Sequence, residues 1–157
     1  MKKFLLSALV ALFMALVPAT AQELAVYASD SKLSFNVPDN AEEISDTDEL
    51  IQVQTPDDGF SVVAMPFLLD EFTTDELGET LNEMAVNAGV DLSRANRLQV
   101  SNDDIVGEIF AAKDEDGVLY VYSICANNER GYLLQVLALP AYHGFVDRMF
   151  ETISIEE

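Results

Sequence analysis

The stretch VLYVYSICANNERGYLLQVLAL, residues 118–139, decides the fold of this chain. Aromatic and β-branched residues fill both of its halves, and the polar segment 127–131, which ends in glycine, separates them. This pattern predicts two antiparallel strands, residues 118–126 and 132–139, joined by a hairpin loop. Because both strands are apolar on both faces, we expect them at the centre of a sheet that is covered on each side.

The only cysteine of the chain, Cys125, lies in the first of these strands. With residues 127–131 as the loop, the ladder places Cys125 opposite Leu133 and Ser123 opposite Gln135. Burial in an apolar ladder raises the pKa of a thiol and keeps substrate away from it. We therefore expect Cys125 to be buried and to have no chemical role.

The only histidine, His143, falls in the predicted last helix, with Asp147 and Glu151 following it at four-residue steps. These three positions lie off the apolar stripe of that helix. We expect an exposed histidine beside acids, and therefore no catalytic pair with Cys125.

Further strands are expected on the N-terminal side of the hairpin. Residues 105–113 lead into it through a turn that ends in glycine, which predicts a three-stranded meander. Residues 50–55 and 60–67 flank the turn PDDG and predict a second hairpin. Residues 32–37, KLSFNV, alternate apolar and polar side chains, and residues 98–100 are expected to form a short strand.

Two amphipathic helices complete the pattern. The first, at about residues 74–88, begins with a capping box formed by Thr73 and Glu76 and ends before Gly89. The second, at about residues 141–153, follows a proline and carries one continuous apolar stripe. Each stripe has to pack against a sheet. The element order predicts an α+β fold with a mostly antiparallel sheet of six to seven strands, layered as an α/β/α sandwich.

Three segments of the chain together resemble the PsbP-like fold: SFNVPDN at 34–40, GVLYVYSICANNERGYLLQV at 117–136 and FVDRMFETI at 145–153. The resemblance covers nearly all of the chain after its first 21 residues. That family includes the extrinsic photosystem II subunit and many exported bacterial proteins without known activity. The resemblance implies a non-catalytic accessory or binding module. The aromatic residue that usually follows the VP segment is missing, so a photosynthetic role does not transfer.

The first residues have the three parts of a secretory signal. Lys2 and Lys3 precede an apolar run at 4–17, and small residues at 19–21 form a cleavage site. We expect a signal peptide that is cleaved after residue 21, leaving one domain, residues 22–157, in the periplasm or outside the cell. An uncleaved anchor is the alternative. After cleavage we expect no membrane insertion.

The charge of the chain narrows the choice of partners. Eight basic and 28 acidic residues are present, and two of the basic ones precede residue 22, so the charge from there on is 6 minus 28, or −22. Nucleic acid and anionic membranes bind through Lys and Arg, so neither is expected as a partner. The expected partner is an unknown protein or small ligand, and the chain is expected to be a monomer. The acids either attract a basic partner or simply keep the protein in solution.

Six carboxylates lie in DNAEEISDTDE, residues 39–49. Asp46 and Asp48 lack the turn glycine of a calcium loop, so we expect a solvated acidic loop, with weak calcium binding as an alternative. The chain contains no G-x-S-x-G, H-E-x-x-H or phosphate-binding glycine motif. We assign no catalytic, cofactor or metal residue. A carboxylate-based hydrolase remains the alternative function, because sequence does not show which acids meet in space.

One further segment has two interpretations. The apolar residues at 67–69 precede Asp70 and Glu71, and they are either an interface or the buried end of a strand. The largest cleft would separate the two functional hypotheses. Convergent carboxylates in an enclosed cleft would favour an enzyme, and a flat or apolar surface would favour a binding module.

Overall fold

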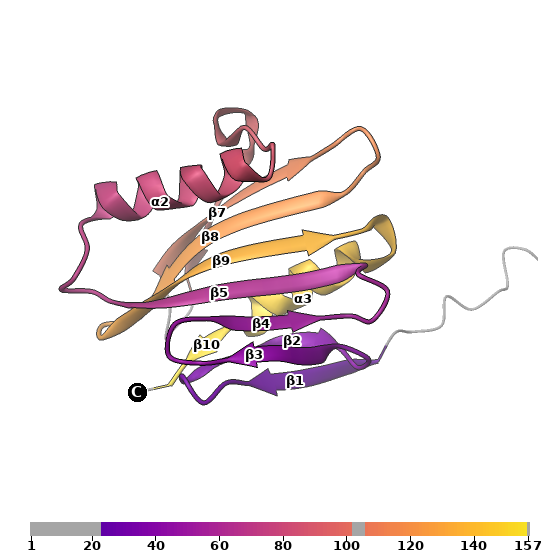
Figure 1. The fold of residues 1–157 in the computed structure, drawn as a ribbon, viewed down its shortest axis with the longest axis horizontal. Helices are drawn as coiled ribbons and strands as arrows, with labels where there is room; N and C mark the ends of the chain where they lie inside the picture. The colour runs from indigo at the N-terminus through magenta and orange to yellow at the C-terminus, as the bar shows by residue number, and fades with distance from the viewer. Residues whose placement is uncertain (1–22, 102–105, 157) are drawn as a thin grey trace, which may run out of the picture.

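The computed structural model describes residues 23–101 and 106–156 of the chain (Figure 1). The expected signal peptide lies outside the described residues. So does Ile105, the first residue of the expected meander.

Within the described part of the chain, ten strands form two antiparallel sheets. In spatial order, the seven-stranded sheet contains β3 (Glu42–Asp46), β4 (Ile51–Gln54), β5 (Phe60–Leu68), β9 (Arg130–Ala138), β8 (Leu119–Ala126), β7 (Val106–Lys113) and β6 (Asn96–Ser101). The three-stranded sheet contains β1 (Leu24–Ala28), β2 (Leu33–Pro38) and β10 (Ser154–Ile155). The predicted central hairpin is confirmed, since β9 is the middle strand of the large sheet and β8 is its neighbour.

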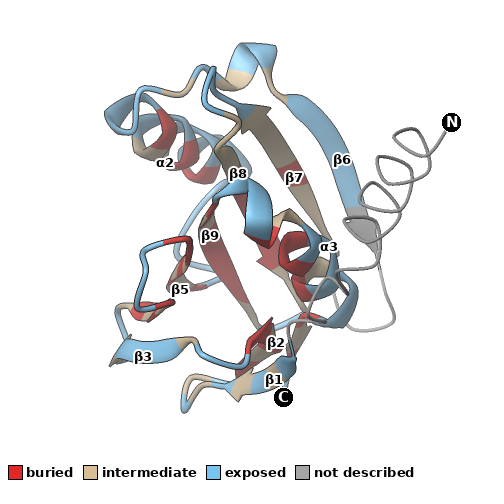
Figure 2. Cartoon of the chain, turned by 90° about the vertical axis from the view of Figure 1, so that its right-hand side faces the viewer, coloured by how far each residue is buried: buried red, intermediate tan, exposed pale blue. Residues whose placement is uncertain are grey.

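The helices cover the large sheet from opposite sides (Figure 2). The structure contains α2 (Thr74–Asn87), the 3-10 turn η1 (Leu92–Arg94), the 3-10 turn η2 (Pro140–Tyr142) and α3 (His143–Thr152). Leu77, Leu81 and Ala85 of α2 pack on one face of the sheet, in a cluster with Tyr122 and Leu133. The opposite face joins α3 and the small sheet in a larger core. The predicted layered α+β fold is therefore confirmed.

The ends of α2 follow local chemistry. The Thr73 side chain accepts the N–H of Glu76, and the Glu76 carboxylate accepts the N–H of Thr73 at 2.8 Å, as the capping box predicts. At the other end Gly89 has a φ of 75°, and the N–H of Val90 bonds to the carbonyl of Ala85 at 2.8 Å. These contacts form a Schellman motif, which uses the left-handed conformation that glycine adopts without strain.

The predicted register of the central hairpin is wrong by one residue. Cys125 pairs with Tyr132, not with Leu133, and Ser123 pairs with Leu134. The reason lies in the turn, where Asn127 Oδ1 accepts the N–H groups of both following residues at 129 and 130, each at 2.9 Å. The turn therefore closes one residue earlier than expected.

The residue that was expected to close this loop, Gly131, lies in the ladder opposite Ala126. A Cβ atom at this position would overlap the ring of Phe67, which covers the strand on the α2 side. The glycine is therefore needed for close packing rather than for the turn.

Two findings go beyond the predicted single sheet. Residues 32–37 were expected to be a strand, and β2 indeed buries Leu33, Phe35 and Val37, but it belongs to the small sheet. The acidic segment 39–49 was expected to be a loop, and it contains β3. Acidic residues have low strand propensity, yet an edge strand lets their side chains reach water while the backbone pairs with β4.

Candidate functional site

The structure places Cys125 in the core. It is fully buried, as predicted, and this burial raises the pKa of its thiol to about 11. The Ser123 hydroxyl donates to the carbonyl of Glu108 at 2.7 Å and lies 3.2 Å from the Cys125 sulfur. Since the serine proton is used in the first bond, the thiol donates to the serine oxygen in the second. These contacts satisfy two buried polar groups between β8 and β7.

His143 is half-buried at the start of α3, so the expectation of an exposed histidine was wrong. Its Nε2 is buried and has no hydrogen-bond partner among the described residues. The helix was expected to begin at about residue 141, but η2 occupies its first turn, so His143 is the first residue of α3.

The acidic segment connects the two sheets. Asp46 Oδ1 accepts the hydroxyl of Ser29 at 2.9 Å, and Asp46 Oδ2 accepts the N–H of Asp30, also at 2.9 Å. Asp46 therefore joins β3 to the turn between β1 and β2. In the described residues, no three His, Cys, Asp or Glu side chains gather in a group that could hold a metal ion.

Residues of β9 make a second set of hydrogen bonds to the turn between β1 and β2. We call the contact of this turn with β3 and β9 the junction. The carbonyl oxygen of Ser31 accepts the Tyr132 hydroxyl, and it also accepts Arg130 Nη1 at 3.2 Å. Burial raises the pKa of Tyr132, so its hydroxyl keeps the proton that this bond needs. The junction is thus a structural connection between the large sheet and the small one.

A groove of about 830 Å³ lies at one end of the large sheet. We call it the end groove. One wall is the segment that follows α2, and the other is the hairpin between β7 and β8 (Figure 1). Its lining comprises Ala88, Gly89, Val90, Asp91, Arg94 and Asn96 on the first wall, and Ala111, Ala112, Lys113, Asp114, Glu115, Leu119 and Tyr120 on the second.

The acid on the first wall, Asp91, caps η1. Its Oδ1 accepts the N–H of Ser93 at 2.9 Å and the Ser93 hydroxyl at 2.6 Å. These bonds, together with the nearby Arg94 guanidinium, lower the pKa of Asp91. Asp91 therefore remains charged and holds the turn in place.

The second wall carries two acids, Asp114 and Glu115, and Asp114 organises the hairpin turn. Its Oδ1 accepts the N–H groups of Asp116 at 3.0 Å and Val118 at 2.8 Å, and its Oδ2 accepts the Tyr120 hydroxyl at 3.4 Å. Burial, and then the charge of Asp114, raises the pKa of Tyr120. Asp91 and Asp114 are thus bonded within their own walls of the groove.

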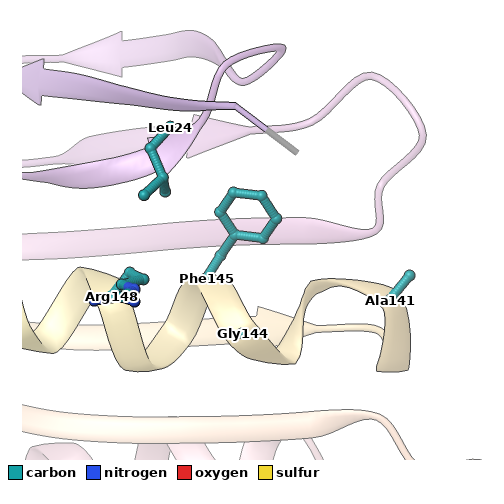
Figure 3. Close-up of a pocket in the computed structure, with 5 residues that line it drawn as sticks. All are labelled: Leu24, Ala141, Gly144, Phe145 and Arg148. Atoms are coloured by element: carbon teal, nitrogen blue, oxygen red, sulfur yellow. The ribbon is translucent and has the colours of Figure 1, made fainter. Parts of the chain in front are cut away.

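A smaller hollow of about 240 Å³ lies between β1 and α3 (Figure 3). Leu24 extends from β1 toward the helix, and Phe145 projects from the helix toward β1. Arg148 borders the hollow and makes a hydrogen bond to Glu151 at 2.8 Å. Ala141 and Gly144 complete the lining. We call this the β1–α3 hollow.

Each of the two interpretations of the apolar segment 67–69 is correct for part of the segment. Phe67 is buried under α2, and its ring meets the ring of Phe72 edge-on at 6.1 Å. Leu68 and Leu69, by contrast, are exposed. Phe67 is therefore the buried end of β5, and the two leucines form a small apolar surface beside it.

Comparison with known proteins identifies the fold. No family model and no curated protein matches the chain. Cyanobacterial PsbP (CyanoP) from Synechocystis sp. PCC 6803 is structurally similar, with a TM-score of 0.56 and 8% sequence identity. The match covers 88% of this chain and 96% of that protein. The chain therefore has a PsbP-like fold. None of the described helices is long and apolar enough to cross a membrane.

Proposed function

We propose that this protein, with its PsbP-like fold, is an exported, non-catalytic binding module that takes its ligand in the end groove. Export is inferred from the basic and then apolar start of the sequence. The observation that carries the proposal is the groove itself, which at about 830 Å³ is more than three times the volume of the β1–α3 hollow. Ligand sites are typically concave, with volumes of about 300–1,000 Å³ and with few polar groups placed among apolar ones.

The lining of the end groove has this mixed character. Val90 and Leu119 contribute apolar surface from opposite walls, and the partly buried ring of Tyr120 lies beside Leu119 on β8. Arg94 and Lys113 contribute a cation from each wall. A small organic ligand or a short peptide segment could contact both kinds of surface at once.

Two of the three acids that line the groove, Asp91 and Asp114, support binding rather than carboxylate catalysis. A hydrolase of that type needs two carboxyl groups that face one substrate bond from about 5 to 9.5 Å apart. Asp91 and Asp114 instead accept hydrogen bonds from the turns of their own walls. Their role is to fix the shape of the groove.

Site-specific photocrosslinking in the producing cells tests the proposal. A crosslinking residue in place of Lys113 lies in the groove, and one in place of Val86 lies on the exposed surface of α2 outside it. We expect a defined product from position 113 that disappears in an Arg94→Ala background, and no such product from position 86. Equal capture from both positions would show that the groove is not the binding surface.

A further inference from the structure

The edges of the two sheets differ in how they are protected against other strands. Unpaired edge strands attract further strands, and proteins usually block them with charges, bulges or short length. β3 carries three acids and an irregular register between Glu43 and Ser45, and β10 has only two residues. β6 carries Arg97, which is paired with Glu108. Each of these edges therefore has at least one protective feature.

β1 has none of these features. Its sequence, LAVYA, contains no charged residue, and it forms the outer strand of the small sheet, regularly paired with β2 over all five residues. Val26 is 74% exposed and Leu24 is 44% exposed, on the same face of the strand. Leu24 also borders the β1–α3 hollow, which extends this apolar surface onto α3 (Figure 3). Among residues 23–101 and 106–156, no strand pairs with the outer edge of β1, so the strand offers both a backbone edge and an apolar face.

The ends of β1 are acidic. At its start lie Glu23 and Asp39, both exposed, and the backbone carbonyl of Glu23 accepts the N–H of Asp39 at 3.0 Å. Past its other end lies the exposed Asp30, whose N–H bonds to Asp46. Lys32 is the only basic residue between positions 22 and 93. At this end the acids lie beside two basic residues, Lys32 and Arg130, and Arg130 bonds to the carbonyl of Ser31. The uncharged strand therefore has carboxylates at both ends, and the acidic character is clearest at its start.

We propose that β1 accepts an additional strand from another protein, namely an extended segment with alternating apolar side chains and Lys or Arg at its ends. Strand addition draws affinity from main-chain hydrogen bonds and specificity from the side chains. The apolar centre of such a segment would lie against Val26 and Leu24. Its cationic ends would meet the carboxylates of Glu23, Asp39 and Asp30. The remaining charge of −22 on the chain would attract the same partner from a distance.

The same charges argue against a second copy of this chain as the occupant. An antiparallel β1–β1 pair with its two-fold axis at Val26 would place Glu23 of one copy opposite Ser29 of the other, next to Asp30. Two chains that each carry −22 would meet at their acidic ends. Like charges across an interface weaken association, so the partner is expected to be basic.

Two synthetic peptides test the proposal on the purified protein. We expect KVTVTVK to bind with a Kd below about 1 mM and to protect the amides of β1 from hydrogen exchange. We expect EVTVTVE, which has the same apolar centre, to bind at least about tenfold more weakly. Because the attraction is electrostatic at its ends, binding of the first peptide should weaken when ionic strength rises from about 0.05 to about 0.5 M.

A matched pair of variants locates the site. Val26→Lys introduces a charge at the centre of β1, and Ile44→Lys introduces the same charge at an exposed apolar position on the edge strand β3. We expect Val26→Lys to weaken KVTVTVK binding at least about tenfold and Ile44→Lys to leave it within about twofold. The proposal is overturned if KVTVTVK does not bind, if both peptides bind equally, or if protection appears away from β1. It is also overturned if the protein alone dimerises in sedimentation experiments and Val26→Lys abolishes the dimer.

Discussion

Tyr142 donates its hydroxyl to Asp57 Oδ2 at 2.8 Å, although 85 residues separate the two. Asp57 Oδ1 accepts the Thr55 hydroxyl at 2.7 Å and the N–H of Gly59 at 3.0 Å. The Tyr142 ring lies against Gly59, where a Cβ atom would overlap it. The turn between β4 and β5 is therefore shaped to receive the tyrosine that precedes α3, and this contact helps to hold α3 on the sheet.

Replacing Tyr142 with phenylalanine should lower the urea midpoint of unfolding. The ring would still pack, but Asp57 Oδ2 would lose a hydrogen bond from a buried residue. Tyr120→Phe is the control, because the Tyr120 hydroxyl makes a longer, exposed bond to Asp114 at 3.4 Å. Equal midpoints for the two variants would mean that the Tyr142–Asp57 bond does not hold α3 in place.

The effect of Tyr142→Phe should depend on pH. The hydrogen bonds from Thr55, Tyr142 and Gly59, in that order, lower the pKa of Asp57 in the folded protein. A lowered folded pKa gives stability that is present above the unfolded value of about 3.9 and is lost as pH falls through the folded value. The difference in stability between wild type and Tyr142→Phe should thus be full at pH 6 and shrink below about pH 4. A difference that stays constant down to about pH 2 would contradict this account.

Gly131→Ala should destabilise the protein by about 1–3 kcal/mol, because the new methyl group would overlap the ring of Phe67. Gly78 provides the opposite case on the exposed side of α2, where a Cβ atom would meet no atom within 4 Å. Gly78→Ala should stabilise the protein by about 0.5–1 kcal/mol, since alanine favours a helix over glycine. Chemical denaturation measures the free energy of unfolding of both variants. If Gly78→Ala destabilised the protein as much as is expected for Gly131→Ala, the packing explanation would be refuted.

Cys125 should not react with thiol reagents while the protein is folded. Its burial and its pKa of about 11 leave it neutral and inaccessible at pH 8. We expect labelling only in urea, at the rate of unfolding. Val86→Cys in a Cys125→Ala background, which places a thiol on the exposed face of α2, should label at once and serves as the control. Rapid labelling of native Cys125 would show that β8 is open to solvent.

Thr73→Ala should cost about 1 kcal/mol of stability, because the capping box at the start of α2 would lose its side-chain oxygen. The backbone N–H of Thr73 and, second, its hydroxyl lower the pKa of Glu76. The variant loses only the bond from the hydroxyl, so the pKa of Glu76 in an NMR titration should rise in part. Thr80→Ala, which removes a hydroxyl bonded within the helix to the carbonyl of Glu76, should leave that pKa in place. An unchanged Glu76 titration in Thr73→Ala would rule out the Thr73 hydroxyl as a cause of the lowered pKa.

Short-range sequence patterns were sufficient to predict most helices and strands of the fold. The capping box and Gly89 placed both ends of α2 to within a residue, because these signals act between neighbours in the chain. Period-two apolar patterns located β2 and β4, and apolar runs bounded by glycine-ending turns located β5 and the central hairpin. The register of that hairpin was missed by one residue because Asn127 bonds two amides and closes the turn early.

The end groove had no signal in the sequence. Its walls, residues 88–96 and 111–120, come from two separate segments, and the acids in them resemble any other acids in a chain that has 28. Their bonds to turn amides appear only when the backbone is folded. The half-buried position of His143 likewise depends on η2, whose first residues the apolar stripe had assigned to the helix.

The sequence by itself determined the acidic character, which is a matter of composition. It also determined most strands, the caps of α2 and the burial of Cys125, since these depend on side-chain pattern or on contacts a few residues away. The tertiary structure decided which strands are neighbours. β2 leaves the large sheet and pairs with β1 and β10, and Tyr132 reaches Ser31 across 101 residues. These strand pairings and contacts depend on packing between distant segments. The alternation of apolar and polar side chains along one strand does not specify them.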